Sequence, residues 1–449
     1  MSSKGLNSKR KDEEEVMRKA IVVLISIVLT LGLLIGCGNG NGAGGNGNGG
    51  EDIIELSFMV GDGTSQEGFM AVSALAEEAI GVRLVMETRP GGLEGENLLR
   101  TRLATGDAAD LLWFNSGALL ETMNPTEYFI DITNEPFAQR LEQTFKNAVT
   151  VNGQVFGLPG AASMGGGVFF NRDMYERLGL EVPNTWSEFL ANAQAIQDAG
   201  YTAIVGSYAD AWTAQIPWLA DNFNLLRDQP DFPEQFELGN AKWADTPAAL
   251  RGFEKLDEIR PFLNSDFLAT TFEEGVDIMA NGEAGHFFML TFALQNVYEM
   301  YGRDYVENIG FFGVPGDSGE RGMTVWVADA FYGNANSENK DAILRFMEFF
   351  MTDEAIEAFI AVQSPVGPLP IIGFELPETA FSAVRIDMQR YFDAGLTAPA
   401  LEFMTSVKGP NAPLITQAVI SGQMSPLEAA IQYDEDCAHQ ARQLGLDWD

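Results

Sequence analysis

The feature that most constrains the fold is a regular alternation of strand-like and helix-like segments. Residues 53–60, 82–86 and 110–114 are short, mostly apolar runs with the length of buried strands. Residues 67–80 and 93–104 lie between them and repeat apolar side chains at the three- and four-residue spacing of a helix. Strands and helices that alternate in this way form a parallel sheet covered by helices. The sequence therefore predicts an α/β fold.

The alternation continues toward the C-terminus. Short apolar runs predict further strands at residues 154–159, 167–172, 203–206, 285–289 and 323–331. Helical spacing of apolar residues predicts further helices at residues 185–199, 272–281, 340–351 and 353–360. Thr185 and Glu188 have the spacing of a capping box, which favours a helix start. A chain of 449 residues is too long for one compact core, which indicates two domains of ordinary size.

Polar residues follow two of the predicted parallel strands at the point where each strand ends. Asp62 comes after the first strand, and Asn115 and Ser116 come after the third. Ligands of open α/β sheets bind beyond the carboxyl ends of the strands. We therefore expect these three residues on the loops that form a ligand site.

The first fifty residues have the pattern of an export signal followed by a tether. Residues 1–19 carry six basic side chains, and residues 20–36 form an apolar run of seventeen residues without charge. This run is slightly shorter than the roughly 20 residues that span a bilayer, and Cys37 follows it. Residues 38–50 contain only Gly, Asn and Ala, which is typical of a flexible linker. Together with the letters LIGC at residues 34–37, this arrangement resembles a bacterial lipoprotein signal.

The resemblance implies that the signal peptide, residues 1–36, is removed and that Cys37 becomes a lipid-carrying N-terminus. Residues 37–50 then form the tether. A diacylglyceryl group would supply two acyl chains, and stable anchoring needs two signals because one chain holds a protein only marginally. An uncleaved signal anchor remains the alternative. Met17 is a more ordinary start than Met1, because four acidic residues lie shortly before it.

Charge and the scarcity of histidine and cysteine exclude several classes of function. The formal net charge is −37, so the surface repels nucleic acid, and we expect no nucleic-acid partner. The two histidines, His286 and His439, are too few for an ordinary histidine-based zinc site. No phosphate-loop or calcium-loop spacing occurs. With Cys37 assigned to the lipid, Cys437 has no disulfide partner. We therefore expect no metal and no cofactor.

Five stretches in order resemble the extracellular solute-binding proteins that feed ABC importers, in particular the carbohydrate-binding family that includes maltose-binding protein. They lie at residues 103–110, 153–159, 169–175, 178–189 and 272–287. The second and third, GQVFGLP and FFNRDMY, are similar to the family patterns GxxYGxP and YYNKdlF. Phe170 and Arg172 are mild departures, and Phe287 stands where the family often has Trp.

This resemblance implies the type II periplasmic-binding-protein-like fold, with two α/β lobes joined by a hinge. The chain then crosses between the lobes three times, and we expect the crossings near residues 160, 315 and 360. Lobe one would comprise residues 51–160 and 315–360. Lobe two would comprise residues 161–314 and 361–449. Closure of the lobes on a solute is a hinge motion.

The resemblance also implies candidate ligand contacts, because aromatic rings cover the C–H patches of a sugar and polar side chains bind its hydroxyls. Asp210 and Trp212 match in type an acid and an aromatic that the family uses. Phe287 comes shortly after the start of a predicted strand, at Gly285. Trp326 and Asp329 lie on a strand that we expect in lobe one, facing the cleft. Core packing is the alternative for each aromatic residue.

The function implied is that of a substrate-binding lipoprotein, not an enzyme. It would capture a sugar or oligosaccharide, deliver it to the transmembrane subunits of an ABC permease, and remain a monomer anchored by lipid to the outer face of the cytoplasmic membrane. Two alternatives stay open. One is a surface glycan hydrolase with Asp210 and Asp329 as paired carboxylates. The other is a sensor or adhesin lipoprotein without a role in transport.

Overall fold

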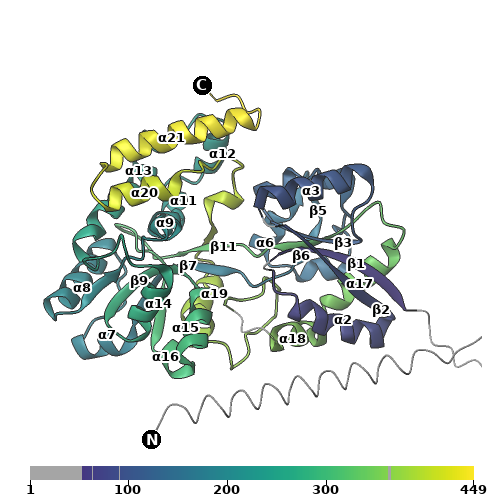
Figure 1. Cartoon of the computed structure of the whole chain (residues 1–449), viewed down its shortest axis with the longest axis horizontal. Helices are drawn as coiled ribbons and strands as arrows, with labels where there is room; N and C mark the ends of the chain where they lie inside the picture. Colours follow the sequence, from purple (N-terminus) through teal and green to yellow (C-terminus); the bar gives the residue numbers. More distant parts are fainter. Residues whose placement is uncertain (1–52, 63, 91, 363–365, 449) are drawn as a thin grey trace, which may run out of the picture. The chain divides into compact units, whose positions relative to one another are not determined.

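The structure, a computed structural model, describes residues 53–62, 64–90, 92–362 and 366–448 (Figure 1). The predicted signal peptide, the tether and the lipid site at Cys37 lie outside these residues. Within them, no helix combines the length and the apolar character needed to cross a bilayer. A five-stranded and a six-stranded sheet organise this part of the chain.

The first sheet has the strand order β2-β1-β3-β12-β6. Its strands are β1 (Ile54–Gly61), β2 (Val82–Arg89), β3 (Leu111–Phe114), β6 (Gly157–Pro159) and β12 (Ala330–Gly333). β1 pairs in parallel with β2 and with β3, which confirms the predicted parallel arrangement. β12 pairs antiparallel with β3 and β6. The carboxyl ends of β1 and β3 therefore lie at the same edge of the sheet.

Helices pack on the first sheet through an aromatic core. They are α2 (Glu67–Ile80), α3 (Gly92–Thr105), α17 (Lys340–Phe350) and α18 (Asp353–Ala361). Phe69 of α2 contacts Phe58, Phe331 and Phe350, with ring centroids 4.9, 5.7 and 5.8 Å apart. Gly68 lets α18 approach α2, because a Cβ atom there would lie 2.6 Å from the Phe359 ring. We call the first sheet and its helices the first lobe.

Shorter elements complete the first lobe between β3 and β6. They are α4 (Ala118–Glu121), α5 (Pro125–Tyr128), the 3-10 helix η1 (Pro136–Arg140), α6 (Gln143–Ala148), β4 (Thr150–Val151) and β5 (Gln154–Val155). β4 and β5 form a separate two-stranded hairpin. Gly117, at a φ of 72°, begins α4 directly after the loop that follows β3.

The second sheet is built around β7, with the order β13-β11-β7-β9-β8 and β10 also paired to β7. Its strands are β7 (Met164–Asn171), β8 (Thr202–Val205), β9 (Ala284–Leu290), β10 (Ile309–Phe312), β11 (Met323–Trp326) and β13 (Thr397–Pro399). β9, β10 and β11 all pair antiparallel with β7. The sheet with its helices forms the second lobe.

Helices of the second lobe surround this sheet and form a layer near the C-terminus, where α20 and α21 pack on α13 (Figure 1). The long ones are α7 (Arg172–Leu178), α8 (Trp186–Asp198), α11 (Asn222–Asp228), α13 (Pro247–Ile259), α14 (Phe272–Ala280), α15 (Ala293–Tyr301), α20 (Ala412–Ile420) and α21 (Pro426–Gln443). The short ones are α9 (Ala211–Ala214), α10 (Ile216–Leu219), α12 (Phe232–Glu237), η2 (Arg260–Phe262), α16 (Arg303–Glu307), η3 (Ala383–Met388), α19 (Gln389–Asp393) and η4 (Leu401–Phe403). The predicted capping box at Thr185 and Glu188 is confirmed at the start of α8.

The segment that we expected as one strand at residues 323–331 is divided between the two sheets. Its first half, β11, pairs with β7 and β13 in the second lobe. Its second half, β12, pairs with β3 and β6 in the first lobe. The change of sheet falls between Trp326 and Ala330, and not near residue 315 as expected. The apolar pattern of the sequence did not reveal this break between the strands, because Val327 and Ala328 in the connection are also apolar and buried.

The chain leaves the first lobe for the last time later than the expected residue 360. Leu369 and Ile371 pack in the core of the first lobe, whereas Phe381 packs in the core beside β9 and β10. The return therefore lies between Ile371 and Phe381. The first passage between the sheets lies between Pro159 of β6 and Met164 of β7.

Candidate ligand-binding site

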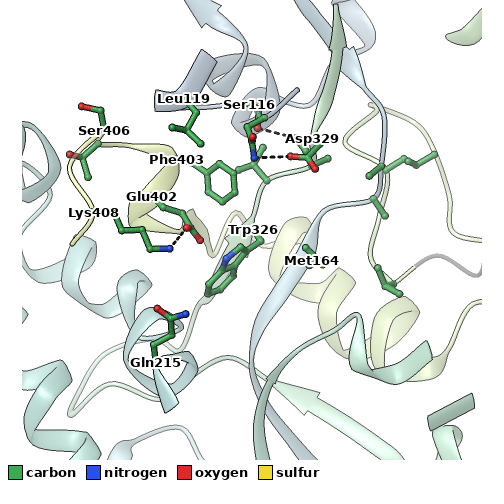
Figure 2. A pocket seen from close by; sticks show the side chains of 18 of the residues that line it. Ser116, Leu119, Met164, Gln215, Trp326, Asp329, Glu402, Phe403, Ser406 and Lys408 are labelled. Carbon is green, nitrogen blue, oxygen red and sulfur yellow. Dashed lines mark hydrogen bonds and ion pairs between the residues drawn. The ribbon is translucent and has the colours of Figure 1, made fainter. Parts of the chain in front are cut away.

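A cavity of about 760 Å³ is lined by residues of both lobes and is shown in Figure 2. Its lining combines aromatic and aliphatic side chains with amides, hydroxyls and charged groups. The principal side chains are Asn115, Ser116, Leu119, Met164, Gln215, Trp326, Asp329, Glu402, Phe403, Thr405, Ser406 and Lys408. Four of the predicted site residues, Asn115, Ser116, Trp326 and Asp329, are therefore brought together here.

The loop after β3 and the connection after β11 are held together by hydrogen bonds at one wall of the cavity. The Ser116 hydroxyl donates to the carbonyl of Ala328 at 2.9 Å. The Asn115 amide lies 3.4 Å from Oδ1 of Asp329 and donates to it. The Tyr332 hydroxyl donates to the carbonyl of Asn115 at 2.9 Å. These bonds hold the loop after β3 and the connection after β11 together at this wall.

Trp326 lines the cavity and is labelled in Figure 2, while most of the side chain is buried in the core of the second lobe and 7 % of it is exposed. It is the last residue of β11 and pairs with Met164 of β7. Its ring lies over Gly166, where a Cβ atom would come within 2.1 Å of ring atom Cζ3. Because β11 belongs to the second sheet, Trp326 is a residue of the second lobe and not of lobe one as expected.

Asp329 carries the most perturbed electrostatics of the lining. Burial raises the pKa of its carboxyl to about 6, while the positive charge of Arg89 opposes that rise. Arg89 is itself 7 % exposed and donates to the carbonyl of Trp113 at 3.3 Å. Its Nε has no hydrogen-bond partner among the described residues. The arginine thus acts on Asp329 by its charge.

An irregular segment of the second lobe, between β13 and α20, supplies lining residues that the sequence did not indicate. Glu402 and Lys408 form an ion pair there, and Phe403 lies between them along the chain (Figure 2). Gln215, at the end of α9, also lines the cavity, and its Oε1 has no hydrogen-bond partner within the described residues. No periodicity or motif marks these residues.

Four other predicted site residues lie outside this cavity. Asp62 is exposed after β1, and its charge acts on Arg89. Asp210 accepts a hydrogen bond from the backbone N–H of Phe272 at 2.7 Å, at the start of α14. The paired carboxylates of the hydrolase alternative, Asp210 and Asp329, are therefore not brought to one cavity.

The two remaining aromatic candidates pack against neighbouring rings. The ring of Trp212 lies 5.4 Å from that of Phe272 and 6.1 Å from that of Phe292, between centroids. Phe287 is 2 % exposed in the core around β9. Core packing, the alternative considered for these rings, describes the position of Phe287.

Comparison with protein families gives a match over most of the chain. The model of the bacterial extracellular solute-binding protein family matches residues 64–357. The chain belongs to this family. Its members bind solutes and are not enzymes.

Curated relatives match only part of their own length. A multiple sugar-binding protein of Streptococcus mutans is 26% identical over 26% of this chain and 28% of its own. An uncharacterised ABC transporter extracellular-binding protein of Pyrococcus horikoshii is 24% identical over 46% of this chain and 48% of its own. The chain thus spans less than half of the length of these relatives.

Solved structures of solute-binding proteins share the fold over nearly their whole length. The apo form of RafE from Streptococcus pneumoniae has a TM-score of 0.73 at 17% identity, covering 87% of this chain and 99% of that one. A family 1 extracellular solute-binding protein from Bifidobacterium longum has a TM-score of 0.71 at 16% identity, covering 86% and 100%. The expected two-lobed, type II solute-binding fold is therefore confirmed.

Proposed function

We propose that the chain is the substrate-binding lipoprotein of an ABC importer and captures a sugar or short oligosaccharide in the cavity between its lobes. The observation that carries this proposal is that Trp326, Asn115, Ser116 and Asp329 line one cavity. A sugar presents flat C–H patches and hydroxyls, which an aromatic face and convergent acceptors and donors bind together.

The charges of the lining favour an uncharged ligand. Glu402 and Lys408 neutralise each other at one side of the cavity. Burial raises the pKa of Asp329 to about 6, and the nearby positive charge of Arg89 offsets the charge of the ionised carboxylate. Because these charges offset one another, the lining attracts a strongly charged solute only weakly. Gln215 adds an uncharged amide side chain to the lining.

The attachment and partners in this proposal come from the first fifty residues and from the family. The LIGC sequence at residues 34–37 supports lipid attachment at Cys37, and the Gly/Asn tether would leave the folded part free to turn toward a permease. Placement on the outer face of the cytoplasmic membrane follows from this attachment. One of the matched relatives carries an ABC transporter name.

A thermal-shift panel tests the proposal. The mature protein is heated with monosaccharides, oligosaccharides, peptides and polyamines in turn. Ligand that binds only the folded state stabilises it by about 2.7 kcal/mol at one hundred times Kd, so a sugar should raise Tm measurably. A rise in Tm with peptides or polyamines and with no sugar would overturn the sugar assignment while leaving the fold intact.

A further inference from the structure

We propose that Phe403 forms an end wall that limits the length of the ligand, an inference that rests on the proposed function. Phe403 separates the 760 Å³ cavity from a second cavity of about 210 Å³. Both cavities are lined by Phe403, Thr405 and Ser406. The wall between them is therefore one short stretch of the second lobe.

The opposite side of this wall is the first turn of α4 in the first lobe. Ser116 and Leu119 line the larger cavity, whereas Gly117 and Glu121 line the smaller one. Consecutive residues of one segment thus face two different spaces. The boundary between the two cavities therefore lies near Gly117, whose backbone contacts Phe403.

Gly117 and Phe403 meet backbone to backbone. A Cβ atom on Gly117 would lie 2.7 Å from both the Cα and the carbonyl oxygen of Phe403, and the φ of 72° also favours glycine. The Phe403 ring packs against the cores of both lobes. In Figure 2 the ring stands beside Leu119 and Ser116. The wall is therefore continuous from one lobe to the other.

Hydrogen bonds hold the segment that carries Phe403. Glu237 of α12 accepts from the backbone N–H of Ser406 at 2.9 Å and from its hydroxyl at 2.6 Å, and it also accepts from the Thr405 hydroxyl. The backbone N–H of Lys408 donates to the side chain of Gln440 in α21. A segment tied to two helices of the second lobe keeps its position within that lobe, so the second-lobe side of the wall is rigid.

The smaller cavity offers polar groups to an additional sugar unit. Asn147, Thr150 and Glu121 line it together with Ser406. With the Phe403 ring in place, a ligand in the larger cavity ends at the wall. Without the ring, only the backbone contact between Gly117 and Phe403 divides the two cavities, and a longer oligosaccharide extends further toward the polar groups beyond.

The test compares ligand-length profiles of the wild-type protein and Phe403→Ala. Affinities are measured by calorimetry for malto-, cello- and xylo-oligosaccharides of one to six units, and for sucrose, raffinose and stachyose. We expect the wild-type affinity to stop rising beyond a certain length, and Phe403→Ala to bind the next longer member at least tenfold more tightly than wild type. An unchanged length profile would overturn the inference.

Control variants separate this effect from a general loss of packing. Phe262→Ala removes an equally half-buried ring that lines neither cavity, and its length profile should match the wild type. If Phe403→Ala fails to fold, Phe403→Val removes the ring but keeps more of the side chain. It should shift the dependence of affinity on ligand length in the same direction. Wild-type protein that binds none of these sugars would contradict the proposed function itself, which is a different outcome from an unchanged profile.

Discussion

At the scale of single residues, Asp329 is the group whose chemistry depends most on its surroundings. It sits in the connection between two strands that belong to different lobes, and it lines the cavity. Burial raises its pKa from the ordinary value of 3.8 to about 6 despite the nearby charge of Arg89. The folded protein therefore holds a proton on this carboxyl that the unfolded chain has already lost.

This difference predicts the pH dependence of an Asp329→Asn variant. Between about pH 4 and pH 6 the folded state binds more protons than the unfolded state, so stability from this group is present at low pH and lost as pH rises. The full cost above pH 6 is on the order of 3 kcal/mol. Asparagine avoids it, and its oxygen still accepts from Asn115.

Urea unfolding of both proteins from pH 3.5 to pH 7.5 measures this difference. Asp329→Asn should gain stability relative to wild type as pH rises through the window and should gain nothing further above it. A difference between Asp329→Asn and wild type that does not change with pH would contradict the pKa assigned here.

The sequence indicated some residues of the cavity for physical reasons and had no means of indicating others. Asn115 and Ser116 were found because the end of a parallel strand is a fixed place in the fold. Trp326 and Asp329 were found through the family resemblance. Phe403 is brought to the cavity by a tertiary contact with Gly117, almost three hundred residues away, and the chain near it has no periodicity or motif.

At the scale of elements, the glycine run of β7 decides how the second sheet is filled. Gly165, Gly166 and Gly167 each face a large side chain from β10 or β11. A Cβ atom on Gly166 would lie 2.1 Å from the Trp326 ring, which is too close for any side chain to fit without movement. The absence of side chains on β7 therefore makes the position of Trp326 possible.

A Gly166→Ala variant tests this dependence. The added methyl group should displace the Trp326 ring, cost about 1–3 kcal/mol of stability through overpacking, and lower sugar affinity at least tenfold. Gly61→Ala is the matched control, since a Cβ atom there would make only an ordinary contact, 3.4 Å from the Thr64 hydroxyl. Calorimetric titration of a folded Gly166→Ala protein that binds as tightly as wild type would show that the ring position does not matter.

Most elements of regular structure followed from the sequence because their apolar spacing agrees with their burial. The helix predicted at residues 67–80 is confirmed as α2 with the same bounds. The strand predicted at residues 323–331 was divided, because spacing reports burial and not the sheet to which a buried segment pairs. That assignment depends on hydrogen bonds to residues far away in the sequence.

At the scale of the whole folded part, two sheets with separate cores both contribute to the cavity of about 760 Å³. The chain passes between the lobes at residues 159–164, 326–330 and 371–381, so each lobe is built from distant stretches of sequence. Cavity residues lie on the first two of these passages, at Ala161, Ala162 and Met164 and at residues 326–329. A ligand bound there contacts both lobes, which is what hinge closure on a solute requires.

The central claim is that this cavity binds a sugar through the Trp326 face. The most direct measurement is calorimetric titration of wild type, Trp326→Ala and Trp212→Ala with the sugar that stabilises wild type most. Trp212→Ala removes an equal ring from outside the cavity. We predict that Trp326→Ala loses at least tenfold in affinity, about 1.4 kcal/mol, while Trp212→Ala binds as wild type does. Undiminished binding by a folded Trp326→Ala protein would contradict the account.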